Sequence, residues 1–259
     1  MKEVEAVIHL AGISGSAGKT TPVRQIDRVN AAGTAHLARC AARAGVRRFV
    51  FLSSIKVHGE ACETPIRETD PFSPCSDYAA SKMKAETALW KISNTSGMEA
   101  VILRPALVYG PGVKGGFFQL MRWIAKGMPL PLGAVRNRRS ILFMDNLIEG
   151  ILNALTHPGA AGKTFLVADP EALSTPELIR KLSDSLSVRT RLYNVPVSWL
   201  RLLAVACGRK KEFLSLTGSL WADTARIQEE IGWRPTASVD TGIQKTALWF
   251  REQAHGVIA

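Results

Sequence analysis

The sequence predicts an α/β protein with a doubly wound parallel sheet, followed by a smaller mixed C-terminal lobe. Predicted strands and helices alternate over residues 4–105, and each strand is apolar along its whole length. Strands of that composition are typical of a parallel sheet covered by helices on both faces. Because the pattern changes after Gly112, we expect one domain over 1–112 and a second over 113–259. A segment at about 140–170 is expected to return to the main sheet.

The composition is that of a globular chain with an excess of positive charge. The 259 residues are 46% hydrophobic, so the chain can bury a large core. It carries 33 Lys and Arg against 22 Asp and Glu, a net charge of +11. That excess suits an anionic substrate or a phosphate-bearing surface, and a solvated basic face is an equally good interpretation. Nucleic-acid binding is not expected, because no basic stripe with interleaved aromatic residues occurs.

The four cysteines have neither C-x-x-C spacing nor the spacing of metal ligands. We therefore predict no metal site and reduced thiols in a cytoplasmic protein. No apolar run approaches the roughly 18 residues of a membrane-spanning helix, so no integral membrane segment is expected. The longest candidate, 195–207, is interrupted by Ser198 and Arg201. We interpret it as an amphipathic helix docked on the core.

Residues 4–12 form the first predicted strand, which runs into a glycine turn. Gly12, Gly15 and Gly18 have the spacing of a dinucleotide-binding fingerprint, and the last of them begins a Gly-Lys-Thr triplet like the end of a phosphate-binding loop. The phosphate-binding loop lacks its first glycine, because Ile13 stands there. The fingerprint lacks the acidic residue that should follow about 20 positions later. We interpret the stretch as a flexible loop after a strand other than the first of the sheet.

The rest of the first part continues the alternation. Its elements are a helix at 22–45, a strand at 49–54, a helix at 77–97 and a strand at 99–105. Gly45 suits the end of the first helix, and Asp77 is the expected N-cap of the second. Between them lies a long loop at 57–77, rich in proline and acidic residues. Loops of this length are often functional, and a solvated connector is the alternative interpretation.

Ser54, Tyr78 and Lys82 suggest proton-transfer chemistry. A Y-x-x-x-K pair places Tyr78 and Lys82 one turn apart on the same helix face. A phenol is a poor acid or base at neutral pH, since its unperturbed pKa is about 10, and a nearby ammonium lowers that pKa. Ser54, at the end of the preceding strand, can then hold a carbonyl or hydroxyl oxygen while Tyr78 moves the proton. The pair alone is weak evidence, because most such pairs are ordinary helix neighbours.

The second part contains a basic run at 136–139 with three arginines. The run suits a diphosphate, because guanidinium groups bind phosphate oxygens bidentately, and a solvated hairpin tip is an equally good interpretation. The predicted elements of this part are a helix at 115–126, a strand at 140–144, a helix at 145–157, a strand at 164–168, a helix capped at Ser174 and further helices to Trp249.

Five motifs occur in order along the chain. They are His9-Leu10-Ala11-Gly12, Val29-Asn30-x-x-Gly33-Thr34, Phe51-Leu52-Ser53-Ser54-x-x-Val57-His58-Gly59, Tyr78-x-x-Ser81-Lys82 and Arg104-Pro105-x-x-Val108-Tyr109-Gly110-Pro111-Gly112. The ordered set resembles the extended short-chain dehydrogenase/reductases of the NAD-dependent epimerase/dehydratase type. Segments 139–146 and 222–235 are similar to the nucleotide-sugar branch, the UDP-sugar 4-epimerases and 4-keto-sugar reductases of surface-polysaccharide pathways. The resemblance covers nearly the whole chain and implies a Rossmann-like fold with NAD or NADP as cofactor.

The resemblance also implies a role for each matched residue. Tyr78 becomes the general acid/base, Ser54 the group that hydrogen-bonds the sugar C4 oxygen, and Lys82 the residue that lowers the tyrosine pKa and holds the nicotinamide ribose. The residues placed against the cofactor are Ala11, Gly12, Asn30, Ser53, Tyr78, Lys82, Pro105 and Val108. The residues placed against the substrate are Ser54, Tyr78, Phe118 and, at the diphosphate, Arg139.

The chain departs from the family pattern in two places. His58 stands where the motif usually has tyrosine, which loosens the inference on substrate. The chain also begins at what corresponds to the fourth strand of the family, so the resemblance implies that the glycine-rich strand–helix–strand portion, with its pyrophosphate-binding helix N-terminus, is missing. The first strand would then be an exposed apolar edge.

Three hypotheses follow. The first is an NAD(P)-dependent epimerase or reductase acting at C4 of a UDP-sugar, and we expect it to be a homodimer formed through the helices at 22–45 and 77–97. The second is a truncated fragment that lacks cofactor binding and is inactive or serves as an interaction module. The third keeps the enzyme class but replaces the sugar by a steroid or phenolic ketone, which the arginine run disfavours.

Overall fold

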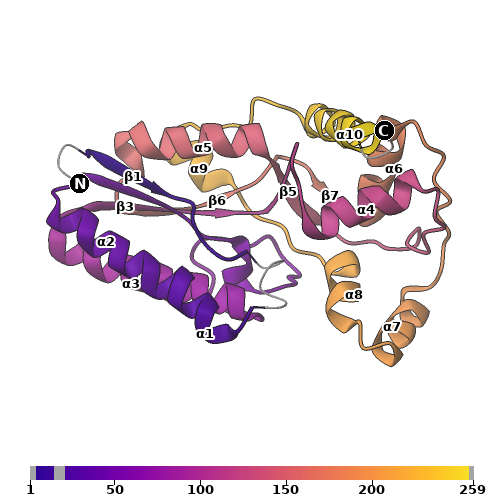
Figure 1. The fold of residues 1–259 in the computed structure, drawn as a ribbon, viewed down its shortest axis with the longest axis horizontal. Coiled ribbons are helices and arrows are strands. Elements are labelled where there is room, and N and C mark those ends of the chain that lie inside the picture. The colour runs from indigo at the N-terminus through magenta and orange to yellow at the C-terminus, as the bar shows by residue number, and fades with distance from the viewer. Residues whose placement is uncertain (1–3, 15–20, 257–259) are drawn as a thin grey trace.

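The computed structural model describes residues 4–14 and 21–256, which form two lobes side by side (Figure 1). In the larger lobe, a four-stranded parallel sheet has the order β1-β2-β3-β6. Its strands are β1 (Ala6–His9), β2 (Arg48–Leu52), β3 (Glu99–Pro105) and β6 (Lys163–Val167). Because all four are parallel, their carboxyl ends meet at one edge of the sheet.

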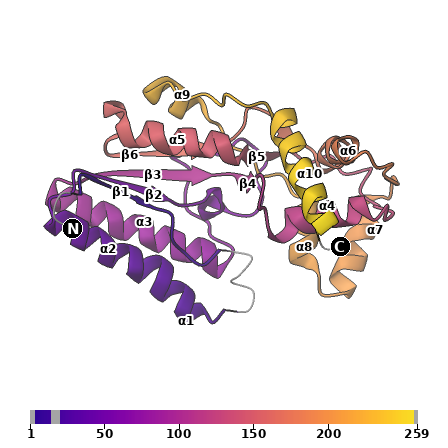
Figure 2. The ribbon, with the colours of Figure 1, turned by 45° about the horizontal axis from the view of Figure 1, so that its top comes forward.

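Helices cover both faces of this sheet (Figures 1 and 2). On one face lie α3 (Asp77–Ser96) and a continuous helix made of α1 (Val23–Ile26), the π-helical η2 (Asp27–Ala32) and α2 (Gly33–Arg43). On the other face lie α5 (Met144–Thr156) and α9 (Ala225–Ile231). Buried apolar side chains fill the space between each layer and the sheet. The α/β class with a parallel sheet that the sequence predicted is therefore confirmed.

The smaller lobe is built on a three-stranded mixed sheet with the order β4-β5-β7. Strands β4 (Leu107–Tyr109) and β5 (Arg139–Phe143) are parallel, and β7 (Ala172–Leu173) is antiparallel to β5. The helices of this lobe are α4 (Gly115–Ala125), α6 (Thr175–Leu186), α7 (Val197–Ala206), α8 (Lys210–Thr217) and α10 (Val239–Gly256). Strand β4 is not predicted by the sequence pattern, because a strand of three residues is too short to show one.

The ends of two helices show how local chemistry sets their boundaries. Helix α3 is capped by Ser76, whose hydroxyl accepts a hydrogen bond from the amide of Ala79. The prediction that Asp77 is the cap was wrong by one residue. Asp77 lies in the first turn, where a carboxylate also stabilises the helix N-terminus. At α6 the predicted cap is present, and Ser174 and Glu177 form a reciprocal capping box.

The segment at 195–207 forms the predicted helix, α7, which packs on the smaller lobe by one side only. Val197 and Leu200 pack partly against the core there, and no residue over 197–206 is buried. The sequence shows which side chains are apolar but not whether another element covers them. No helix in the described part of the chain is long and apolar enough to cross a membrane.

Strand β1 forms one edge of the four-stranded sheet. Ile8 in this strand and Leu10 just after it are 40% and 53% exposed. The apolar edge predicted for the first strand is thus present in the described residues.

Candidate active site

Ser54 and Tyr78 lie together at the carboxyl edge of the parallel sheet. Ser54 follows the end of β2 and caps the short helix η3 (Ile55–His58), where its hydroxyl accepts a hydrogen bond from the amide of Lys56 at 3.3 Å. Tyr78 lies in the first turn of α3, and the side chain of Ser54 is near enough to its phenol to lower the pKa of that group. The structure therefore brings together two residues that the sequence separates by a long loop.

The acidity of Tyr78 differs from the sequence-based expectation. Burial raises the pKa of its phenol, and the side chain of Ser54 lowers it in part. The sequence predicts that Lys82 lowers this pKa, but its ammonium donates to the carbonyl oxygen of Leu52 in β2 instead. A phenol with a raised pKa keeps its proton at neutral pH. Tyr78 is therefore protonated at neutral pH.

Lys82 is buried beneath the tyrosine, with 4% of the residue exposed. Its Nζ donates a hydrogen bond to the carbonyl oxygen of Leu52 at 2.7 Å and lies 4.6 Å from the centre of the Phe51 ring. Burial lowers the pKa of Lys82 to about 8, although the charge of the Glu86 carboxylate acts in the opposite direction and raises it. Because an ammonium has three donors, the bond to Leu52 leaves capacity for a ligand hydroxyl.

Gly12 and Asn30 bring the loop after β1 close to Lys82. Asn30 lies in η2 and is 1% exposed. Its amide group accepts a hydrogen bond from the backbone amide of Ile13 at 2.7 Å and donates to Oγ of Ser81 at 3.0 Å. A Cβ atom placed on Gly12 would lie 3.0 Å from Oδ1 of Asn30 and 3.6 Å from Nζ of Lys82. The glycine therefore leaves open a narrow space beside the ammonium.

The groups around this space suit the ribose of a nucleotide. Ala11 and Gly12 are exposed at the carboxyl end of β1, and the ammonium of Lys82 lies next to them. A buried donor beside an open glycine loop suits the hydroxyl groups of a ribose. The two other glycines of the fingerprint and the Gly-Lys-Thr triplet fall within 15–20, outside the described residues.

A buried ion-pair network that the sequence did not predict lies next to Lys82. The carboxylate of Glu86, fully buried, lies 2.6 Å from Nη2 of Arg104 and also accepts a hydrogen bond from the hydroxyl of Ser53. Nη1 of Arg104 in turn lies 2.8 Å from Nε2 of His58. Because a guanidinium group only donates, this ring nitrogen accepts and His58 is neutral. Burial and the charge of Arg104 both lower the pKa of His58 accordingly.

The network changes the interpretation of Ser53. The family resemblance placed Ser53 against the cofactor, whereas its hydroxyl is committed to Glu86. The sequence could have placed Glu86 in this network, because Glu86 follows Lys82 by four residues and so lies on the same helix face. The partner Arg104 ends up there only because β3 lies next to β2.

The arginine run does not act as one unit. Arg136 and Arg138 are exposed, so the solvated interpretation holds for them. Arg139 is half-buried, and its Nη1 donates to the carbonyl oxygen of Gly218 at 2.9 Å. Burial lowers its pKa, and the nearby Glu60, from the loop of the larger lobe, raises it. Arg139 therefore lies where the two lobes meet and stays a candidate for binding a diphosphate.

The remaining predicted residues are Phe118, Pro105 and Val108. Phe118 packs against Trp249 and Phe250 of α10, with ring centres 6.2 and 5.4 Å apart. Its contacts are thus those of a core residue of the smaller lobe, and its role in substrate binding stays a prediction. Pro105 ends β3 and Val108 lies in β4, so both flank the passage between the two sheets. Their contact with a nicotinamide also stays a prediction.

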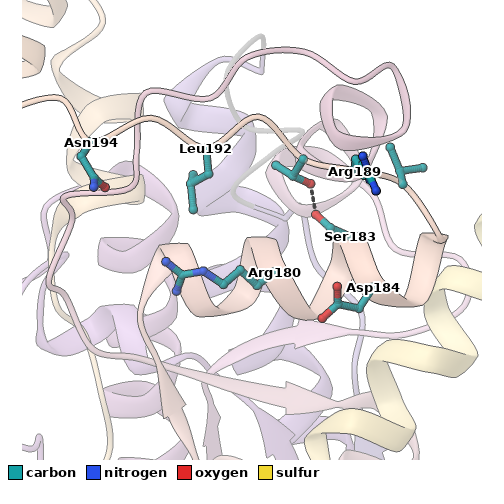
Figure 3. A pocket seen from close by; sticks show the side chains of 8 residues that line it. Arg180, Ser183, Asp184, Arg189, Leu192 and Asn194 are labelled. Atoms are coloured by element: carbon teal, nitrogen blue, oxygen red, sulfur yellow. Dashed lines mark hydrogen bonds between the residues drawn. The ribbon is translucent and has the colours of Figure 1, made fainter.

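A separate hollow lies over α6, between this helix and the segment at 188–194 (Figure 3). Its walls include Arg180, Asp184 and Arg189, and a hydrogen bond joins Ser183 to Thr190. None of the predicted site residues lines it. Within the described ranges, no group of three His, Cys, Asp or Glu side chains could hold a metal ion. The chemistry therefore points to the Ser54–Tyr78–Lys82 cluster.

Comparison with known proteins agrees with this geometry. Residues 1–168 match the model of the NAD dependent epimerase/dehydratase family. The chain belongs to this family. A UDP-glucose 4-epimerase from Vibrio cholerae is 38% identical over 255 residues, which are 96% of this chain and 78% of that relative. An N-acetyl-alpha-D-glucosaminyl-diphospho-ditrans,octacis-undecaprenol 4-epimerase from Escherichia coli O157:H7 is 28% identical over 65% of this chain and 51% of the relative.

Solved structures of the family share the fold. A dTDP-glucose 4,6-dehydratase from Streptomyces venezuelae with NAD bound is 27% identical, with a TM-score of 0.79 over 98% of this chain and 76% of that chain. A UDP-glucose 4-epimerase from Thermotoga maritima is 22% identical, with a TM-score of 0.79 over 96% of this chain and 78% of that chain. This member of the epimerase/dehydratase family therefore has a Rossmann-like fold, and its family consists of NAD-dependent enzymes of nucleotide-sugar chemistry.

Proposed function

We propose that this family member is an NAD- or NADP-dependent epimerase or reductase acting at C4 of a UDP-sugar. The observation that carries the proposal is the meeting of Ser54, Tyr78 and the buried Lys82 at the carboxyl edge of the parallel sheet. Ligands of open parallel sheets bind at that edge. The 38% identity to a UDP-glucose 4-epimerase supports both the UDP-sugar and the C4 position.

The proposed chemistry follows from the groups that the chain supplies. Ser54 hydrogen-bonds to the C4 oxygen and aligns it with the phenol of Tyr78. When bound, the nicotinamide cofactor supplies the hydride acceptor and donor for carbon C4. Tyr78 keeps its proton at neutral pH because burial raises its pKa, so it can protonate the C4 oxygen when a ketone is reduced.

The reverse direction needs a different charge state. When the C4 hydroxyl is oxidised, its proton must pass to a Tyr78 phenolate, and a phenolate requires a cation nearby. Lys82, one helical turn away, is the residue that would supply this charge. Lys82, Gly12 and Asn30 would hold the nicotinamide ribose, and Arg139 would contact the diphosphate of the sugar nucleotide. Arg139 suits that role because it reaches the junction of the two lobes.

We also propose a cytoplasmic role in surface-polysaccharide biosynthesis and a homodimer formed through the helices at 22–45 and 77–97. The similarity to an epimerase whose name contains an undecaprenol-linked sugar supports the pathway. The packing of α2 against α3 on one outer face of the sheet supports the dimer, because such a helix pair offers a continuous surface (Figure 2).

The decisive experiment is to incubate the purified chain with UDP-glucose or UDP-galactose and NAD or NADP, and to measure the C4 epimer by NMR. We expect conversion by the wild type and its loss in Tyr78→Phe, with cofactor binding retained in that variant. Cofactor binding without conversion of any UDP-sugar would overturn the sugar assignment. Failure to bind either cofactor in a fluorescence titration would favour the inactive-fragment hypothesis.

A further inference from the structure

Helix α7 presents an apolar face that no described part of the chain covers. Trp199 and Leu202 are 70% and 71% exposed, and Leu203 and Val205 are 63% and 56% exposed. Isolated exposed leucines are common on protein surfaces, but adjoining ones on a single helix are not. A contiguous patch of this kind indicates a surface that contacts something apolar.

The arrangement of the helix separates its two sides. Trp199, Leu202, Leu203 and Ala206 follow helical spacing along one side and line a common shallow hollow. On the opposite side, Val197 and Leu200 pack partly against the core of the smaller lobe. The helix is therefore anchored by one side and leaves the other free. Figure 1 shows α7 with α8 at the extremity of the smaller lobe, away from the parallel sheet.

The helix lies within a stretch that carries positive charge only. Between Asp184 and Glu212 the sequence has no acidic residue and six basic ones. These are Arg189, Arg191, Arg201, Arg209, Lys210 and Lys211. The first five of them are exposed. This stretch therefore joins an uncovered apolar face to a concentrated positive charge within a chain of net charge +11.

We propose that α7 docks this protein on the surface of an anionic lipid bilayer. The tryptophan and leucines would enter the boundary between headgroups and acyl chains, and the flanking arginines and lysines would meet lipid phosphates. Charge complementarity favours this occupant. An anionic bilayer offers negative headgroups directly beside an apolar interior, and this stretch joins positive charge to an uncovered apolar face in the same way. The proposal concerns a surface apart from the candidate active site and does not depend on the reaction.

The test is co-sedimentation of the full chain with vesicles. Vesicles of phosphatidylcholine with phosphatidylglycerol should bind the wild type, whereas vesicles of phosphatidylcholine alone should bind it weakly. The double variant Leu202→Ser with Leu203→Ser should lose affinity for the anionic vesicles by roughly tenfold or more. Both side chains are exposed, so their replacement removes no contact in the core. Raising the salt concentration should also release the wild type, because charge attraction is screened.

A matched control is available on α5, where Ile148 and Leu152 are 48% and 51% exposed. The double variant Ile148→Ser with Leu152→Ser should bind the anionic vesicles as the wild type does. Equal loss in both double variants, or equal binding to neutral vesicles, would overturn the proposal. A third result would also overturn it. If the wild type does not bind vesicles but is a dimer by light scattering, and the α7 variant is a monomer, then α7 contacts a second copy of the chain.

Discussion

Among the described residues, one carboxylate is buried in each lobe, and the two have different kinds of partner. In the larger lobe, Glu86 lies 2.6 Å from a nitrogen of the Arg104 guanidinium and raises the pKa of Lys82. In the smaller lobe, Asp169 is 3% exposed and is bound by neutral donors instead. Burial raises the pKa of Asp169, and its hydrogen bonds lower it only in part.

The partners of Asp169 come from three elements. It accepts hydrogen bonds from Nδ2 of Asn146 at 2.7 Å, from the backbone amide of Phe143 at 3.0 Å and from the hydroxyl of Tyr109 at 3.4 Å. These donors lie on α5, at the end of β5 and on β4. Asp169, just after β6, therefore ties the main sheet to the smaller one.

The difference shows what each carboxylate is for. An ion pair keeps its charge after burial, and Glu86, on the helix that carries Tyr78 and Lys82, forms such a pair with Arg104. Neutral donors fix geometry without requiring a permanent charge. The candidate active site thus uses buried charge, whereas the junction of the lobes uses hydrogen bonds.

The largest expected effect is a difference in kcat between variants of Tyr78, in the larger lobe, and Tyr109, in the smaller lobe. Under the proposed function, Tyr78→Phe should lower kcat by about 10²–10⁴-fold, because it removes the proton donor. Tyr109→Phe removes only long hydrogen bonds in a packed core and should cost about 1 kcal/mol of unfolding free energy with kcat largely retained. Steady-state kinetics and urea denaturation measure both. Comparable loss of kcat in the two variants would contradict the division of roles.

The second comparison is between matched amide substitutions. Glu86→Gln should lower the free energy of unfolding by about 3–5 kcal/mol, because it leaves the buried charge of Arg104 without its partner. Asp169→Asn keeps one acceptor oxygen and should cost about 1–3 kcal/mol. Urea denaturation of the two variants measures the ratio. A smaller effect at Glu86 than at Asp169 would show that the ion pair is not the stronger structural element.

The two regions should also respond to pH in opposite directions. The pKa of Lys82 falls from 10.5 to about 8 on folding, so its contribution to stability is lost as the pH drops from about 10.5 towards 8. The pKa of Asp169 rises from 3.8 on folding, so its contribution is lost as the pH rises above that value. Unfolding free energies measured across the pH range should show both slopes. Lys82→Met should remove the alkaline slope only, and Asp169→Asn the acidic slope only.

The smallest expected effect concerns the serine caps of α3 and α6. Ser76→Ala should lower the unfolding free energy by about 1 kcal/mol, because the amide of Ala79 loses its acceptor. Ser174→Ala should cost slightly more, since Glu177 also loses the hydrogen bond that the Ser174 hydroxyl donates, while the backbone amide of residue 174 still donates to its carboxylate. Thermal unfolding of the two variants is the measurement. No change at either position would mean that neighbouring contacts hold these helix ends.

Local sequence determined much of this protein. Apolar runs predicted the strands of the main sheet, and β3 has the bounds that were predicted for it. The spacing of Tyr78 and Lys82 predicted their common helix, and the ordered motifs predicted the family that comparison confirmed. These signals depend on residues close together in the chain, where periodicity and turn chemistry operate.

Only the tertiary structure decided the properties that depend on distant segments. Glu86 meets Arg104 because α3 packs over β3, and Asn30 reaches Ile13 because helix η2 lies beside the loop after β1. The raised pKa of Tyr78 reflects burial, which the sequence around it does not encode. The exposure of helix α7 could not be predicted either. An apolar pattern identifies the apolar side chains, whereas their burial depends on which other element covers them.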